Sequence, residues 1–142
     1  MLQGKVIIVT GGARGIGKAC AELFANDGAK IMINDLSLDN AEATAAEIRA
    51  KGGDVRAVGG DMSVEADVIA MVDKTIEAFG RIDGAVNNAG VAMTGAPISE
   101  LPLEGWNHVI GVNLTGRIPL HQVCIPCDDE DWGRRHRQHI VG

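Results

Sequence analysis

Short β-rich runs alternate strictly with longer helical patterns in the first 116 residues, and this alternation limits the possible folds more than any other feature. The apolar run KVIIVT at 5–10 is typical of a strand buried on both faces of a parallel sheet. Further strands are predicted at 30–34, 54–58 and 82–86. Strands that alternate with helices form right-handed βαβ units. We therefore predict an α/β protein with a doubly wound parallel sheet and helices on both faces.

The segments between these strands have helical periodicity. Helices are predicted over 15–26, 39–51, 63–79 and 101–114, and Ser63 is a candidate N-cap. The first helix places four apolar side chains on one face, namely Ile16, Ala19, Cys20 and Leu23. The third helix carries an apolar stripe of Val68, Val72, Ile76 and Phe79.

A glycine-rich turn, TGGARGIG at 10–17, joins the first predicted strand to the first predicted helix. A phosphate group can approach backbone N–H groups closely where side chains are absent, and the N-terminus of a helix attracts negative charge. The strand–turn–helix context supports such a site. The sequence therefore predicts a pyrophosphate site, whose surrounding residues are Gly11, Arg14, Gly15, Ile16 and Gly17.

The glycine spacing and three later motifs resemble those of the short-chain dehydrogenase/reductase family. The turn follows the family pattern T-G-x-x-x-G-x-G. The later motifs are Asp61-Met62, the sequence NNAG at 87–90, and Asn113 within VNLTG at 112–116. This resemblance covers residues 1–116. It implies a Rossmann fold with strand order 3-2-1-4 that binds a nicotinamide dinucleotide at the switch point of the sheet.

The resemblance also implies roles for the matched residues. Asp61 and Met62 would lie at the adenine ring, and Asn113 matches the Asn of the family's Asn-Ser-Tyr-Lys catalytic set. The turn that follows the fourth strand would contribute Asn88, Ala89 and Gly90 to the cofactor site. Structural alternatives stay open: an ordinary helix acid for Asp61, a tie between neighbouring strands for the 87–90 turn, and a polar helix residue for Asn113.

Asp35, at the end of the second predicted strand, bears on which dinucleotide is bound. A carboxylate at this point can accept hydrogen bonds from both ribose hydroxyls of NAD and would repel the 2′-phosphate of NADP. Leu36, rather than a basic residue, follows it, although Arg14 in the glycine turn favours NADP. We expect NAD as the cofactor, with NADP as the less favoured alternative and a solvated loop acid as the structural reading of Asp35.

The resemblance implies hydride transfer between nicotinamide and a secondary alcohol or ketone, together with homo-oligomer formation in an intact family member. The family's reaction needs a Ser, and a Tyr whose pKa is lowered by a Lys four residues further on. This sequence contains no tyrosine. Its serines are Ser37, Ser63 and Ser99. We therefore expect the chain as printed to be inactive, with a non-catalytic dinucleotide-binding fragment as an alternative function.

The composition changes after Gly116, and we expect two regions: a dinucleotide-binding half-domain at 1–116 and an aberrant, poorly ordered tail at 117–142. Codons can be chosen for this tail so that reading one base later gives VFLCTKYAYPAMMKTGGGGIVNISS, which continues the family pattern. We hypothesise a one-base frameshift at Gly116/Arg117, so that the fold is cut short after about the fourth strand and the helix that follows it.

The tail also contains the spacing Cys124-x-x-Cys127 near His121, His136 and His139, which would allow a metal-binding module as a third, less favoured function. We expect no metal site. The net charge of −6 argues against nucleic-acid or anionic-membrane partners. The N-terminus has no signal-peptide pattern and the three cysteines suggest no disulfide framework, so we expect a cytoplasmic location.

Overall fold

The computed structural model describes residues 1–93, 97–116 and 118. The predicted aberrant tail, apart from Ile118, lies outside the described residues, as do the cysteines and histidines of its candidate metal site. The elements, in chain order, are β1 (Val6–Thr10), α1 (Gly15–Asn26), β2 (Lys30–Asp35), α2 (Leu38–Ala50), β3 (Asp54–Gly59), α3 (Glu65–Phe79), β4 (Gly84–Val86), a 3-10 turn η1 (Ile98–Glu100), α4 (Leu103–Ile110) and a π-helical turn η2 (Gly111–Thr115).

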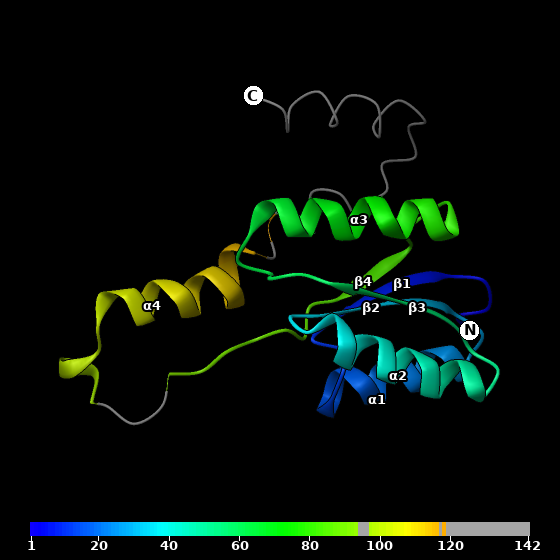
Figure 1. The fold of residues 1–142 in the computed structure, drawn as a ribbon, viewed down its shortest axis with the longest axis horizontal. Helices are drawn as coiled ribbons and strands as arrows, with labels where there is room; N and C mark the ends of the chain where they lie inside the picture. Colours follow the sequence, from blue (N-terminus) through cyan, green and yellow to red (C-terminus); the bar gives the residue numbers. More distant parts are fainter. Residues whose placement is uncertain (94–96, 117, 119–142) are drawn as a thin grey trace.

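The four strands form one parallel sheet in the order β3-β2-β1-β4, as predicted (Figure 1). β1 is central and pairs on one side with β2, where Ile7 lies opposite Ile31. On its other side Ile7 lies opposite Gly84 of β4. The chain therefore runs outward from β1 to β3 and then returns to the opposite side of β1. This reversal is the switch point at which open α/β sheets bind ligands.

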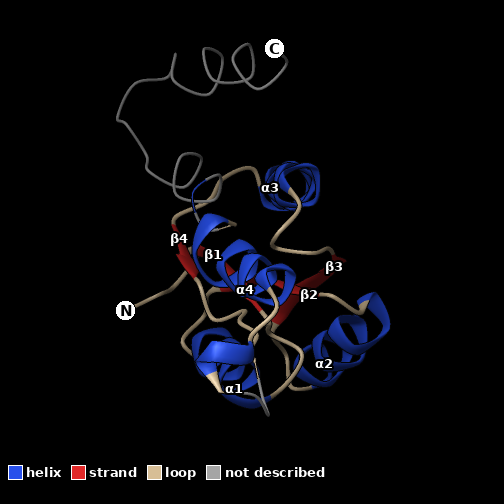
Figure 2. Ribbon diagram, turned by 90° about the vertical axis from the view of Figure 1, so that its left-hand side faces the viewer, coloured by secondary structure: helices blue, strands red, loops and turns tan. Residues whose placement is uncertain are grey.

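Helices cover both faces of the sheet, with α1 and α2 on one face and α3 on the other (Figure 2). Alternate residues of β1 point to opposite faces, so Ile7 and Val9 pack toward α1 and α2, whereas Ile8 packs toward α3. The core under α1 and α2 is completed by the small or β-branched residues Ala21, Ala25, Ala41, Ala45 and Ile48. The core under α3 contains Met32, Val58, Met62, Val68, Met71 and Val72.

The apolar face predicted for α1 is not the face that packs on the sheet. Ile16 is 76% exposed and Leu23 is 60% exposed, and the buried residues are Gly17, Ala21 and Ala25. Small residues on the inner face let the helix axis approach the sheet and the glycine turn closely. Helical spacing alone shows which side chains share a face but not which face packs on the sheet.

The apolar stripe predicted for α3 packs on the sheet at three of its four positions. Val68 and Val72 are buried, and Phe79 is partly buried and packs on the same core. Ile76 is 39% exposed. An α-helix turns by about 100° per residue, so a step of four residues drifts by about 40° around its axis and a step of three turns back by about 60°. The step of three residues from Ile76 therefore brings Phe79 back toward the sheet.

Two helix starts also differ from the prediction. α3 begins at Glu65 with Val64 at the cap, because Ser63 donates from both its backbone N and its Oγ to Asp61 Oδ1, at 2.8 and 2.7 Å. The last helix begins at Leu103 rather than at residue 101, because a residue before a proline, here Leu101, disfavours the helical conformation. It ends as a π-helical turn from Gly111, a form that is common at functional sites.

Candidate functional site

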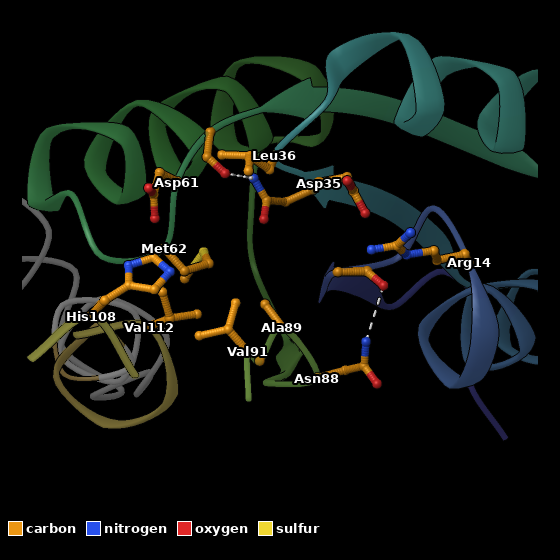
Figure 3. A pocket seen from close by; sticks show the side chains of 14 residues that line it. Arg14, Asp35, Leu36, Asp61, Met62, Asn88, Ala89, Val91, His108 and Val112 are labelled. Carbon is orange, nitrogen blue, oxygen red and sulfur yellow. Dashed lines mark hydrogen bonds between the residues drawn. The ribbon is translucent and has the colours of Figure 1, made fainter. Parts of the chain in front are cut away.

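A pocket lies at the carboxyl ends of the strands, beside the switch point between β1 and β4 (Figure 3). Its walls come from the glycine turn, the loops after β2, β3 and β4, and the last two helical elements. The lining residues are Gly11, Arg14, Asn34, Asp35, Leu36, Gly60, Asp61, Met62, Asn88, Ala89, Gly90, Val91, His108 and Val112. Eight of these are residues that the sequence predicts to bind the cofactor: Gly11, Arg14, Asp35, Asp61, Met62, Asn88, Ala89 and Gly90.

The glycine turn is packed so closely that side chains would not fit at two of its positions. A Cβ atom at Gly17 would overlap the Gly11 carbonyl oxygen and lie 2.6 Å from Asn88 Nδ2. A Cβ atom at Gly11 would lie 3.0 Å from Ala89 Cα, and the φ of Gly11 is +60°. Gly15 differs, because its φ is +55° but no described atom lies within 4 Å of its Cβ position. Gly11 and Gly17 thus shape the turn, and Gly15 leaves open space beside it.

Asn88 ties the loop after β4 to the glycine turn. Its Nδ2 donates to the backbone oxygens of Thr10 and Gly11, both at 3.0 Å. Thr10 Oγ1 accepts from the backbone N–H groups of Asn88 and Ala89, both at 3.1 Å. The 87–90 turn therefore ties two neighbouring strands together, which was the structural alternative for it, and it also lines the pocket.

Asp35 and Arg14 border the same part of the pocket (Figure 3). Asp35 Oδ1 accepts a hydrogen bond from the backbone N of Ser37 at 3.3 Å, which fixes the carboxylate where β2 ends. Among the described residues no ion pair joins Arg14 to Asp35. Leu36, beside Asp35, exposes an apolar side chain. The Asp35 carboxylate thus offers a hydrogen-bond acceptor for a ribose hydroxyl, and the neighbouring Leu36 offers an apolar surface for a flat ring.

Asp61 lies in the loop after β3 and carries a stabilised negative charge. Its pKa is lowered, chiefly by the hydrogen bond from the backbone N–H of Ser63, then by the Ser63 hydroxyl, and to a smaller degree by nearby His108. Both Ser63 bonds go to Oδ1, so Oδ2 is left without a hydrogen bond among the described residues. The folded loop therefore stabilises the ionised form of Asp61, and its Oδ2 is available to a ligand.

Asn113 connects η2 to the segment that follows the 87–90 turn. Its Oδ1 accepts from the backbone N of Val91, and its Nδ2 donates to the backbone O of Val91, each at 2.8 Å. It does not line the pocket, and neither do Gly15, Ile16 and Gly17. Asn113 therefore places the elements around the pocket rather than touching its interior.

Replacing Asn113 by alanine is expected to lower the free energy of unfolding by about 1–3 kcal/mol, because both backbone groups of Val91 lose their partner. Urea titration followed by circular dichroism measures this change. Asn107→Ala is the matched control, since Asn107 is an exposed asparagine of α4. Equal stabilities of the two variants would contradict the bridging role.

Six lining residues are missing from the sequence prediction, namely Asn34, Leu36, Gly60, Val91, His108 and Val112. Four of them end a predicted strand or lie beside a motif or residue that follows one, so the rule that ligands lie at the carboxyl ends of strands could have identified them. His108 and Val112 come from the last two helical elements. No motif marks His108, and only the adjacent Asn113 points to Val112.

The fold is a doubly wound α/β sheet with a pocket at its switch point, which is where folds of this class bind nucleotides. The sequence matches the family described as short chain dehydrogenase over residues 5–135, and the chain belongs to this family. The 2,5-dichloro-2,5-cyclohexadiene-1,4-diol dehydrogenase of Sphingobium indicum is 43% identical over 115 residues, which are 81% of this chain and 45% of that enzyme.

Two solved structures agree with this assignment. A metagenomic short-chain oxidoreductase in complex with NADP is 34% identical, with a TM-score of 0.81 over 86% of this chain and 55% of the other. The 3-ketoacyl-(acyl-carrier-protein) reductase of Brucella melitensis complexed with NADH is 36% identical, with a TM-score of 0.84 over 95% of this chain and 55% of the other. The chain spans about half the length of the curated relatives it matches.

Within the described residues no helix has the length and apolar character needed to cross a bilayer. The same residues contain no group of three or more histidine, cysteine or acidic side chains arranged to hold a metal ion.

Proposed function

We propose that this chain binds a nicotinamide adenine dinucleotide in the pocket, as the nucleotide-binding half of an NAD(P)-dependent oxidoreductase. The observation that carries this proposal is the N-terminus of α1, which begins at the glycine turn beside the pocket. Its cap residue, Arg14, makes no side-chain cap hydrogen bond, and no acidic residue lies in the first turn. The positive end of this helix is therefore open to an anionic group such as a pyrophosphate.

The other helices of the sheet show the contrast. The Ser37 side chain caps α2 and Asp39 lies in its first turn, and Glu65 and Asp67 lie in the first turn of α3. These acids compensate the dipoles of their own helices. At α1 the fold instead supplies two glycines with positive φ and open space at Gly15, which fit the close approach of a phosphate.

The reaction we propose for the whole protein is hydride transfer between the cofactor and a secondary alcohol or ketone. A bound dinucleotide supplies the hydride chemistry through its nicotinamide ring. The residues of this chain hold and orient it: the glycine turn at the phosphates, Asp35 at the adenosine ribose, and Asp61 with Met62 at the adenine. The positions of Asp61 and Met62 support this assignment, since they lie in the same pocket as the glycine turn.

We further propose that NAD is preferred to NADP. The Asp35 carboxylate lines the pocket, and one of its oxygens accepts the Ser37 backbone N–H. A 2′-phosphate bound beside this carboxylate would bring a second negative charge and be repelled. Arg14 acts in the opposite direction. The two solved relatives bind NADH in one case and NADP in the other, so the preference rests on these side chains.

Replacing Asp35 by alanine should therefore lower the ratio of the NADP Kd to the NAD Kd by about tenfold or more, which corresponds to about 1.4 kcal/mol. Arg14→Ala should raise the same ratio, because it removes the cation available to a 2′-phosphate. Isothermal titration with both dinucleotides measures the two ratios. If Asp35→Ala leaves the ratio within twofold of the parent chain, Asp35 does not select the cofactor.

A non-catalytic dinucleotide-binding module is the second candidate function, because the sequence contains no tyrosine. Binding of NADH without turnover by the protein as it occurs in the cell would support this candidate. For an intact family member we propose a homo-oligomer in the cytoplasm. We also propose that the dinucleotide-binding half-domain comprises residues 1–116, because the composition of the sequence changes after Gly116.

A further inference from the structure

His108 lies at the end of the pocket that holds Asp61 and Met62, opposite the glycine turn and Arg14 (Figure 3). It is the one lining residue that α4 contributes within the described chain. Neither the family motifs nor the predicted site includes it. Its imidazole ring faces the same space as Asp61, Met62 and Val112.

The position of His108 is fixed through the elements that follow it. Val112, four residues further along, is buried, with 7% of its surface exposed, and lines the pocket with His108. The Asn113 side chain binds both backbone groups of Val91. Gly116 packs so closely on the backbone of Met62 that a Cβ atom there would overlap the Met62 carbonyl oxygen. Because η2 is held against the pocket loops at its middle and at its C-terminal cap, the end of α4 that carries His108 is held there too.

The imidazole of His108 makes no hydrogen bond or ion pair with the other described residues. His108 contributes to the stabilised charge of Asp61, yet among the described residues no ion pair joins the two side chains. Asp67 faces the same loop, but its Oδ2 accepts the backbone N–H of Asp61 at 2.8 Å. The ring thus has an apolar neighbour on η2, a carboxylate nearby and no hydrogen bond of its own in the described chain.

We propose that His108 is a binding residue for the adenine ring of the dinucleotide and that its imidazole packs against the purine. This inference rests on the proposed function. A flat aromatic side chain can stack on any nucleobase, and removing such a stacking contact weakens binding substantially. Met62 and Val112 supply the apolar surroundings that a purine needs. Substitutions of His108 therefore act on the adenosine half of the cofactor and not on the nicotinamide half.

The test is the Kd of the 142-residue chain for NADH and for ADP-ribose, which keeps the adenosine half but lacks nicotinamide. His108→Ala is expected to weaken both ligands by the same factor, about tenfold. His108→Phe keeps a flat ring and should restore most of the affinity. Asn107→Ala, on the exposed part of α4, should leave both constants unchanged, and the thermal midpoint of each variant shows whether α4 remains folded.

The outcomes separate the two proposals. If the parent chain binds neither NADH nor ADP-ribose, the proposed function fails and this inference fails with it. If the parent chain binds both and His108→Ala binds them equally well, only the inference fails. A loss of NADH affinity without a matching loss for ADP-ribose also overturns it, and so does a His108→Phe variant as weak as His108→Ala, because stacking would then not be the contact.

Discussion

A methyl group added at Gly17 is expected to abolish dinucleotide binding. Its Cβ atom would overlap the Gly11 carbonyl oxygen and lie 2.6 Å from Asn88 Nδ2. Those two atoms are themselves hydrogen-bonded at 3.0 Å, so the substitution disturbs both the turn and the bridge that holds it. We expect the Kd of Gly17→Ala for NADH to rise on the order of 100-fold or more, which corresponds to about 3 kcal/mol. Fluorescence titration with NADH measures this change.

Two other glycines calibrate that result. Gly84→Ala in β4 is the matched control, because no described atom lies within 4 Å of its Cβ position and its φ is not positive. Its affinity for NADH should equal that of the parent chain. Gly15→Ala should have an intermediate effect, since only its positive φ resists a side chain, at a cost of about 1–2 kcal/mol. Binding by Gly17→Ala within threefold of the parent chain would show that the turn can relax.

The second large effect concerns turnover. The chain as printed should bind NADH and yet give no measurable oxidation of secondary alcohols or reduction of ketones. A positioned general acid or base contributes about 10²- to 10⁴-fold to the rate, and this sequence has no tyrosine to take that role. The absorbance of NADH, followed with a panel of ketones at saturating cofactor, measures the rate. Sustained turnover would mean that another side chain moves the proton.

The coding DNA provides the control for this expectation. Resequencing across codons 110 to 145 would reveal a surplus base at Gly116/Arg117 if the hypothesised frameshift is correct. The protein expressed from the restored frame should then turn over under the same assay. An intact reading frame would refute the frameshift and favour the non-catalytic dinucleotide-binding function.

The parallel sheet and the place of the glycine turn could be predicted because both depend on local patterns. The period of the apolar residues distinguishes strands from helices, and their alternation predicts a parallel sheet with right-handed crossovers, whereas the order of the strands was implied by the family resemblance. The turn is recognisable because glycine adopts the φ of +60° at Gly11 without the steric cost that a side chain would bring. These features are encoded within a few consecutive residues, and the structure confirms them.

The features that the sequence did not reveal depend on packing between distant segments. The buried face of α1 consists of Gly17, Ala21 and Ala25, because the helix lies too close to the sheet for larger residues. His108 reaches the pocket only because η2 packs on the Met62 and Val91 loops. Neither arrangement has a local signature, so a helical pattern alone could not show which side chains would meet the ligand or the core.

The bridge between Thr10 and Asn88 also has a consequence for how the chain folds. The two residues lie 78 positions apart, and two hydrogen bonds join them directly. Closing so long a loop costs conformational entropy before any contact is gained, and contacts of this kind slow folding. The binding pocket is therefore completed only when β4 docks beside β1. A dinucleotide that binds only the folded chain raises its equilibrium stability by mass action. Measured dinucleotide affinity therefore depends on the fraction of chains that have folded as well as on the contacts in the pocket.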